Sequence, residues 1–319
     1  MKTKVLITGG SGFIGTNLVN YLLNKNYIIT NIDKLSKHSN LKNLYQKYNN
    51  YSFYKFNIKN EKKLSKVLTK NFDFIIHLAA ESHVDRSIKN PASFFLENVK
   101  STFILYNAIN KLVVQKKIKS PQIIHVSTDE IYGSILKGSS KESSNTFTSS
   151  PYSASKASSE NIAQAFMTTF GLSVCIIRIC NNYGPYQNKE KFIPKSILSI
   201  KKEGKIYIYS KGKNVREWMH VNDTCNAIYK IIKKFKNKKI FNIGSTFKKT
   251  NNQLAKLIIK NSQIKFKDTI INYIKDRKGH DFRYSLNSNL FSKTYKWKAK
   301  IQIDEGIKDT INWFSKKND

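Results

Sequence analysis

Residues 4–15, with the sequence KVLITGGSGFIG, decide the fold of this chain. The run from Lys4 to Thr8 predicts a short buried strand, and the apolar positions between Leu18 and Leu23 have the spacing of an amphipathic helix. Glycines between a strand and a helix let the backbone turn tightly and approach a pyrophosphate at the positive end of the helix. The stretch therefore predicts a dinucleotide-binding turn, built on Gly9, Gly12 and Gly15.

A second strand, Tyr27 to Ile32, ends at Asp33. A carboxylate at the end of this strand is placed to hold the two ribose hydroxyls of an adenosine, which favours NAD over its 2′-phosphorylated form. The cationic neighbour Lys34 weakens that preference.

Further strands alternate with helical segments along the first half of the chain. Strands are predicted at Phe72 to Leu78, Ile123 to Val126 and Ser173 to Ile179, with a helix over Ser93 to Asn110. This alternation predicts an α/β fold with a doubly wound, Rossmann-like parallel sheet. After about residue 180 the pattern is less regular and indicates a smaller C-terminal substrate-binding lobe. The predicted NAD-binding domain is 1–179 plus about 217–243, and the predicted nucleotide-sugar-binding lobe is about 180–216 plus 244–319.

Polar side chains follow the strand at Ile123 to Val126 directly. Ser127, Thr128, Asp129 and Glu130 place hydroxyls and two carboxylates at the carboxyl edge of the sheet, where open α/β folds bind ligands.

Downstream, Tyr152 and Lys156 are four residues apart and share one face of a predicted helix. A nearby ammonium favours the phenolate, so we expect a lowered pKa for Tyr152 and a role as general base. The spacing by itself is weak evidence, because tyrosine and lysine are both frequent here.

Length and composition fit a globular enzyme. The 319 residues are 40% hydrophobic, no stretch approaches the length of a membrane span, and the N-terminus leads straight into a strand, which together predict a cytoplasmic protein. Three cysteines, Cys175, Cys180 and Cys225, lack metal-ligand spacing and are expected to be buried free thiols, with no metal site.

The formal net charge of +35 is the extreme feature of the composition. It is compatible with polyanion binding, but the lysines are scattered and no nucleic-acid module accompanies them, so compositional drift is the favoured interpretation and nucleic acid is not expected as a partner. The Ser-rich segment from Lys137 to Ser150 is predicted to form a loop over the site.

With these motifs placed, the sequence resembles the extended short-chain dehydrogenase/reductase superfamily, and within it the dTDP-glucose 4,6-dehydratases. Thr128-Asp129-Glu130 is the most discriminating motif, since related nucleotide-sugar 4-epimerases typically lack the acidic pair. The other stretches that carry the resemblance are Thr8 to Gly15, His77 to Ser87, Ser127 to Gly133, Pro151 to Ala157, Asn181 to Pro185, Glu190 to Pro194, Arg216 to Trp218 and Asp276 to Asp281.

The resemblance implies an NAD-dependent lyase reaction of deoxysugar biosynthesis in three stages. Tyr152, aided by Lys156 and Thr128, would take the proton of the sugar 4-hydroxyl while hydride passes from C4 to NAD⁺. Glu130 would remove the C5 proton while Asp129 protonates the departing 6-hydroxyl, and hydride would return to C6. Adjacent carboxylates suit these opposite roles only if their environments keep one protonated and the other ionised.

The resemblance also implies binding residues and a homodimer. The cofactor would contact Gly9, Gly12, Phe13, Ile14, Gly15, Asp33, Lys34, Ser36, Asn57, Ile58, Leu78, Ala79, Ala80, Ser82, Val99, Tyr152, Lys156 and Asn182. The substrate would contact Ser82, Thr128, Asn181, Lys191, Phe192, Tyr207, Tyr209, Arg216, Asn251, Arg277 and His280, with Arg216 suited to the diphosphate.

The sequence departs from the family pattern at Asn57, Thr224 and Lys278, which bears on nucleotide affinity and loop shape rather than on the chemistry. No residue separates thymine from uracil, so UDP-glucose remains the alternative substrate. A nucleotide-sugar 4-epimerase is disfavoured by Asp129 and Glu130. A basic polyanion-binding protein that only keeps the fold is the remaining alternative.

Overall fold

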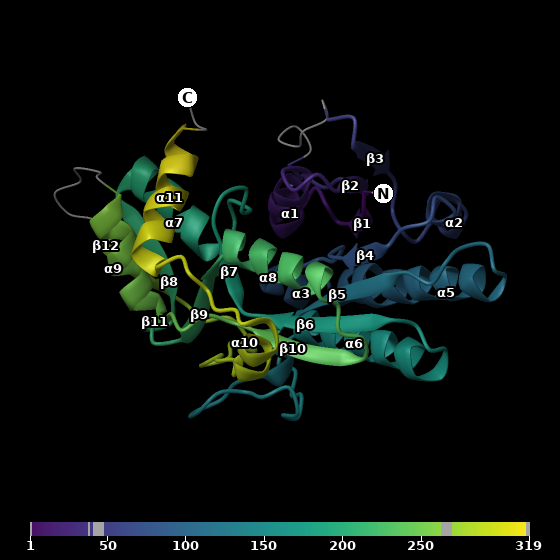
Figure 1. The fold of residues 1–319 in the computed structure, drawn as a ribbon. Coiled ribbons are helices and arrows are strands. Elements are labelled where there is room, and N and C mark those ends of the chain that lie inside the picture. Colours follow the sequence, from purple (N-terminus) through teal and green to yellow (C-terminus); the bar gives the residue numbers. More distant parts are fainter. Residues whose placement is uncertain (1, 38, 41–47, 263–269, 317–319) are drawn as a thin grey trace.

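The computed structural model of the chain describes residues 2–37, 39–40, 48–262 and 270–316. Its centre is a parallel sheet of seven strands in the order β10-β6-β5-β4-β1-β2-β3 (Figure 1). This order, which reverses direction at β1 and β4, is that of a Rossmann fold. The seven strands are β1 (Lys4–Thr8), β2 (Ile28–Asp33), β3 (Tyr51–Lys55), β4 (Phe74–His77), β5 (Gln122–Thr128), β6 (Val174–Ile179) and β10 (Lys239–Ile243).

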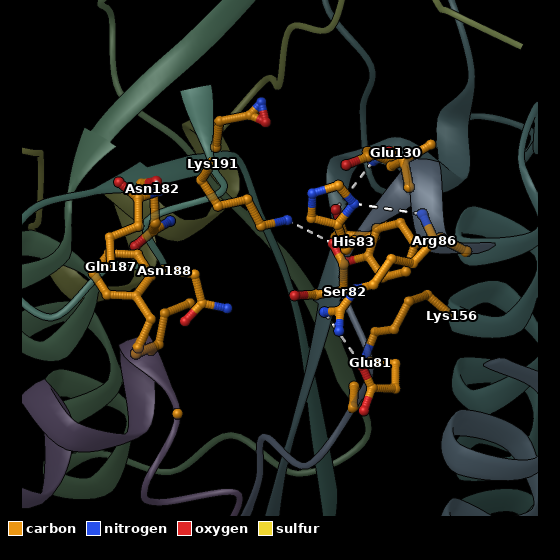
Figure 2. Close-up of a pocket in the computed structure, with 18 of the residues that line it drawn as sticks. Glu81, Ser82, His83, Arg86, Glu130, Lys156, Asn182, Gln187, Asn188 and Lys191 are labelled. Atoms are coloured by element: carbon orange, nitrogen blue, oxygen red, sulfur yellow. Dashed lines mark hydrogen bonds and ion pairs between the residues drawn. The ribbon is translucent and has the colours of Figure 1, made fainter. Parts of the chain in front are cut away.

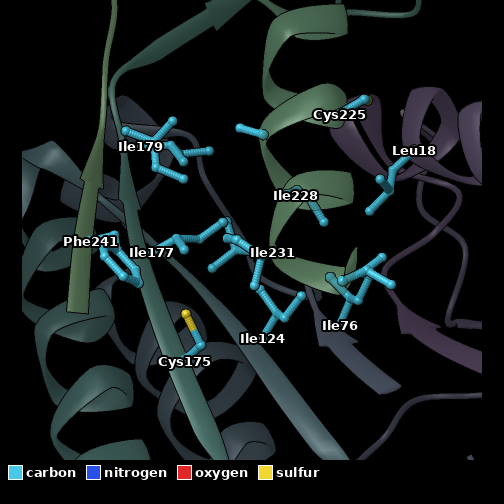
Figure 3. Close-up of a cluster of buried hydrophobic side chains, with 14 of the residues drawn as sticks. Leu18, Ile76, Ile124, Cys175, Ile177, Ile179, Cys225, Ile228, Ile231 and Phe241 are labelled. Carbon is cyan, nitrogen blue, oxygen red and sulfur yellow. The ribbon is translucent and has the colours of Figure 1, made fainter. Parts of the chain in front are cut away.

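Helices cover both faces of this sheet because alternate strand residues point to opposite sides. Val5 and Ile7 join a core with α1 (Phe13–Leu23) and α8 (Val221–Lys233), and Figure 3 shows side chains of α8 packed against those of the sheet. Leu6, between them, joins the core on the other face. The helices that cover this second face are α2 (Glu61–Leu68), α5 (Ser101–Val114) and α6 (Pro151–Thr169).

A smaller part of the molecule stands beside the carboxyl edge of the sheet (Figure 1). It contains one sheet in the order β11-β9-β7 and a two-stranded sheet of β12 and β8. Its core joins residues of helices and strands that all follow residue 180. The elements are β7 (Asn181–Tyr183), α7 (Phe192–Glu203), β8 (Lys205–Tyr209), β9 (Val215–His220), β11 (Lys248–Thr250), α9 (Asn251–Asn261), β12 (Ile270–Ile274), α10 (Asn289–Tyr295) and α11 (Ile303–Lys316), of which α10 packs instead on β10 of the large sheet.

The predicted fold class is confirmed, and so are the predicted strands, whose observed ends differ by at most two residues. The predicted helix over Ser93 to Asn110 is interrupted. It comprises α4 (Pro91–Phe94), a π-helical segment η2 (Phe95–Lys100) and α5. The three cysteines are buried and free, as expected. Within the described ranges, no helix is long and apolar enough to cross a membrane.

The segment from Lys137 to Ser150 was predicted to cover the site, and that prediction is wrong. Its residues do not line the cavity described below. The segment packs instead behind the strand ends, since Ser140 N donates to Ser285 O at 2.9 Å and Phe147 N donates to Ile131 O at 2.9 Å. A polar sequence indicated a loop, but only tertiary contacts decide which side of the sheet a loop covers.

Candidate active site

A cavity of about 480 Å³ lies at the carboxyl edge of the seven-stranded sheet. It extends from the glycine turn after β1 to residues of the smaller part of the molecule. Every residue that the sequence assigned to catalysis, cofactor or substrate lines this cavity except Val99. Val99 is a half-buried residue of η2, and its assignment to the cofactor finds no support in this geometry.

The two carboxylates lie on a single turn of 3-10 helix, η3 (Asp129–Tyr132), that begins where β5 ends. The Thr128 hydroxyl caps this turn by accepting from the Glu130 backbone N–H at 3.3 Å, and it lies 3.2 Å from Asp129 Oδ1. Asp129 is 3% exposed, and its Oδ2 has no hydrogen-bond partner among the described residues. A buried carboxyl oxygen without a partner, facing a cavity, is available to a ligand.

The surroundings of Asp129 and Glu130 shift the pKa values of the two carboxyls to different extents. Burial raises the pKa of Asp129 well above its usual range, and the charges of Glu130 and Glu217 raise it further. Burial also raises the pKa of Glu130, but there three cations oppose the effect, namely Arg277, Lys191 and Arg216. Both pKa values are therefore raised, but the three cations limit the rise for Glu130, so Asp129 holds its proton more firmly than Glu130 does.

Tyr152 and Lys156 lie on the first turns of α6 and are 8% and 7% exposed. The expected lowering of the Tyr152 pKa is wrong for this structure. Burial and the Glu130 charge raise this pKa, whereas the hydrogen bond with Thr128 lowers it. Lys156 Nζ donates instead to the Val126 carbonyl at 2.7 Å, and burial lowers the Lys156 pKa to about 8. The four-residue spacing places Tyr152 and Lys156 on one face of the helix. Burial nevertheless affects the pKa of Tyr152 more than the charge of Lys156 does.

The glycine turn fits a dinucleotide. Gly9 has a φ of +75°, and a Cβ there would lie 2.7 Å from the Cα of Ala79 at the end of β4. A Cβ at Gly15 would lie 2.6 Å from Gly10 Cα, so the turn is closed tightly against the start of α1. Gly12 is the N-cap of α1 and lines the cavity. Backbone and helix N-terminus thus form the cradle that a pyrophosphate requires.

Asp33 is the last residue of β2 and lines the cavity, as predicted for a cofactor-binding residue. Its carboxylate accepts from the backbone N–H groups of Ser11 at 3.1 Å and Leu35 at 2.8 Å, which orients it. Lys34 is ion-paired with Glu97 at 2.8 Å and Glu81 at 3.1 Å. The positive charge that weakened the sequence argument for NAD is therefore matched by two carboxylates.

Several residues assigned to the substrate already have protein partners. Lys191 Nζ reaches across the cavity to the Ser82 carbonyl at 2.6 Å (Figure 2). Tyr209 and Arg277 both contact Asp85, at 3.0 and 3.5 Å, and His280 Nδ1 lies 2.6 Å from Asp276 Oδ1.

Arg216, expected at the diphosphate, is 6% exposed and donates to the carbonyls of Val215, Asp281 and Phe282 at 2.8 to 3.3 Å. Its guanidinium also packs on the Tyr284 ring at 4.2 Å. Three of its five N–H donors are therefore occupied, and fewer remain for a diphosphate than the sequence argument assumed.

The sequence argument missed several charged residues around the cavity. Glu81, Asp85 and Arg86 belong to the quoted stretch from His77 to Ser87, yet their ion pairs depend on partners far along the chain. Arg86, for example, pairs with Glu190 at 3.2 Å. Glu190 likewise belongs to a quoted stretch, whereas the charged Glu97 and the uncharged Tyr284 line the cavity and lie outside every quoted stretch.

A doubly wound sheet whose glycine turn shares one cavity with a Tyr152–Lys156 helix places the protein in the extended short-chain dehydrogenase/reductase superfamily. The sequence profile of GDP-mannose 4,6 dehydratase matches residues 6–310. The chain therefore belongs to the nucleotide-sugar 4,6-dehydratases, in the dTDP-glucose 4,6-dehydratase family.

Individual relatives agree with this placement. The dTDP-glucose 4,6-dehydratase of Haemophilus influenzae is 36% identical over 98% of this chain and 97% of its own length. The structure of DesIV, a dTDP-glucose 4,6-dehydratase from Streptomyces venezuelae with NAD bound, superposes with a TM-score of 0.92 and 35% identity, covering 98% of this chain and 97% of that one. A UDP-glucose 4-epimerase from Thermotoga maritima has a TM-score of 0.90 but 27% identity, covering 99% and 100%.

Proposed function

We propose that this chain is an NAD-dependent lyase that converts dTDP-glucose to its 4-keto-6-deoxy derivative. The observation that carries the proposal is the turn with Asp129 and Glu130 in the same cavity as Tyr152 and the glycine turn. Neither oxidation alone nor epimerisation at C4 requires two carboxyls of which one acts as an acid and the other as a base. Elimination of water needs one acid and one base.

In the first stage, Tyr152 receives the proton of the sugar 4-hydroxyl. Tyr152 must be the phenolate before this transfer, and its hydrogen bond with Thr128 stabilises that negative charge, because this bond lowers the Tyr152 pKa against the effect of burial. The protonated Lys156, one helical turn away, acts in the same direction through its charge. Bound NAD supplies the acceptor for the C4 hydride and later its donor.

In the second stage, Glu130 removes the proton from C5, which the neighbouring C4 ketone has made acidic. Asp129 gives its proton to the 6-hydroxyl, the C6–O bond breaks, and water and a C5=C6 double bond result. Return of the hydride to C6 and of a proton to C5 completes a reaction in which the sugar loses one water with no net oxidation. Arg277, Lys191 and Arg216 support Glu130 as the carboxylate.

The test is a parallel incubation of the purified protein with dTDP-glucose and UDP-glucose in D₂O. We expect loss of water by mass, deuterium at C5, and faster turnover of the dTDP sugar. Faster turnover of UDP-glucose would reassign the substrate. Inversion at C4 without loss of water would replace the proposal with a 4-epimerase.

The proposal includes a homodimer and a division into two units. Phe103 of α5 and Phe170 after α6 are 48% and 52% exposed, and both pack against Phe166, with ring centroids 6.2 and 5.0 Å apart. Exposed apolar side chains that gather on one face mark candidate interfaces. Light scattering of the wild type and of Phe103→Glu should show a dimer and a monomer, respectively.

We further propose that 1–179 with about 217–243 binds the dinucleotide, and that the remainder binds the nucleotide-sugar.

A further inference from the structure

A buried ion pair outside the cavity joins α6, which carries Tyr152 and Lys156, to the neighbouring strand β6. Glu160 lies on α6 and Arg178 on β6, and they are 1% and 4% exposed. Arg178 Nε donates to both carboxylate oxygens of Glu160, at 3.1 and 3.2 Å. Neither residue lines the cavity. A bidentate pair of this kind holds its partners in one relative orientation.

The other side of the same guanidinium holds the turn that carries the carboxylates. Arg178 Nη1 donates to the Tyr132 hydroxyl at 2.5 Å and to the Glu142 carbonyl at 3.0 Å. Tyr132 is the last residue of η3 and does not line the cavity. Its hydroxyl in turn donates to Asn242 Oδ1 on β10 at 2.8 Å. The far end of the turn is thus bound to two neighbouring strands.

The positions of these residues along their elements connect the network to the chemistry. Glu160 follows Lys156 by one helical turn and Tyr152 by two. Arg178 pairs in the sheet with Ser127, next to Thr128. One guanidinium therefore lies between the helix of the proposed oxidation pair and the turn of the proposed elimination pair.

We infer that Arg178, held by Glu160 and bound to Tyr132, is a positioning residue that sets the Asp129–Glu130 turn against the Tyr152–Lys156 helix. The inference rests on the proposed function and deepens it. Its consequence is selective: loosening Tyr132 frees the turn but leaves α6 in place. Elimination should then suffer more than oxidation, because Glu130 must reach the C5 proton while Asp129 reaches the 6-hydroxyl.

The first variant is Tyr132→Phe, which removes the hydroxyl and keeps the buried ring. After mixing with dTDP-glucose, we expect the reduced nicotinamide to form within about twofold of the wild-type rate. Release of dehydrated sugar and deuterium uptake at C5 should fall about tenfold, which corresponds to about 1.4 kcal/mol of activation free energy. Reduced cofactor should therefore accumulate on the enzyme.

The matched control is Tyr106→Phe. Tyr106 is fully buried on α5, and its hydroxyl lies 3.4 Å from His125 Nδ1, on a core that does not include Tyr132. This variant removes a comparable hydroxyl, so melting temperatures of the two variants can be compared. We expect the ratio of the oxidation and elimination rates to stay at its wild-type value.

The second test variant carries two replacements, Glu160→Met and Arg178→Met. It removes both charges of the ion pair together and leaves no buried charge unpaired. It should also slow elimination selectively. The positioning role would be overturned if oxidation and elimination slowed equally in these variants, or if neither Tyr132→Phe nor the double replacement changed the two rates. Either outcome would leave the proposed function intact. A wild-type protein that dehydrates neither nucleotide-glucose would overturn both.

Discussion

At the scale of single residues, the two neighbouring carboxyls differ because different charges surround them. Two carboxylates and one cation act on Asp129, whereas three cations and one carboxylate act on Glu130. This difference supports the proposed roles of Asp129 as the acid and Glu130 as the base.

We predict that Glu130→Gln leaves the first oxidation intact and suppresses elimination by about 10² to 10⁴-fold, the usual contribution of a general base. Single-turnover measurements of reduced nicotinamide and of dehydrated sugar check this. Glu203→Gln, on the exposed end of α7, is the control and should behave as wild type. Normal turnover of Glu130→Gln would remove the base role from this carboxylate.

Because the pKa of Asp129 is raised, we predict that both the elimination rate and the stability of the fold depend on pH. The elimination rate should fall as the pH rises through this pKa, because the acid loses its proton. Stability has the same sign: a carboxyl with a raised pKa in the folded state contributes stability that is lost as the pH rises through that pKa. Asp129→Asn should therefore flatten the pH dependence of the unfolding free energy. An elimination rate that increases steadily with pH would contradict the acid role.

At the scale of secondary structure, α6 and η3 begin with polar caps that position the catalytic groups behind them. The Ser150 side chain accepts from Ser153 N at 3.1 Å, and the Ser153 side chain accepts from Ser150 N at 3.0 Å, a reciprocal cap. Pro151 follows at the first helical position. The orientation of Tyr152 thus depends on the first turn of its helix.

We predict that Ser150→Ala lowers the free energy of unfolding by about 1 kcal/mol, the typical contribution of an N-cap. Chemical denaturation measures this. Ser158→Ala, in the interior of the same helix, removes a hydroxyl that donates to Ala154 O at 2.9 Å and should change stability by less than about 0.5 kcal/mol. Equal effects of the two changes would show that the cap contributes nothing specific.

At the scale of the whole molecule, the net charge of +35 acts on a substrate with a doubly charged diphosphate. A field of this sign concentrates anions near the protein and raises their association rate. Raising the ionic strength from about 0.01 M to about 1 M shortens the screening length from about 30 Å to about 3 Å. We predict that kcat/KM falls several-fold while kcat changes little, as steady-state kinetics in increasing salt would show. A kcat/KM that does not depend on salt would mean that the lysines play no part in capture.

The sequence by itself determined the sheet, the glycine turn and the acidic pair. These features are local: strand periodicity, glycines between a strand and a helix, and the polar residues after β5 require no knowledge of distant contacts. The doubly wound class of the sheet also followed, because strands that alternate with helices indicate a parallel sheet covered on both faces.

The tertiary structure alone decided the electrostatics and the supports of the site. Burial of Tyr152 reversed the expected direction of its pKa, and Lys34 acquired two acidic partners that lie 47 and 63 residues away. The link from Glu160 through Arg178 to Tyr132 joins three separate elements and has no local pattern. Desolvation and long-range ion pairs depend on which surfaces meet after folding. The local sequence around a residue therefore does not predict them.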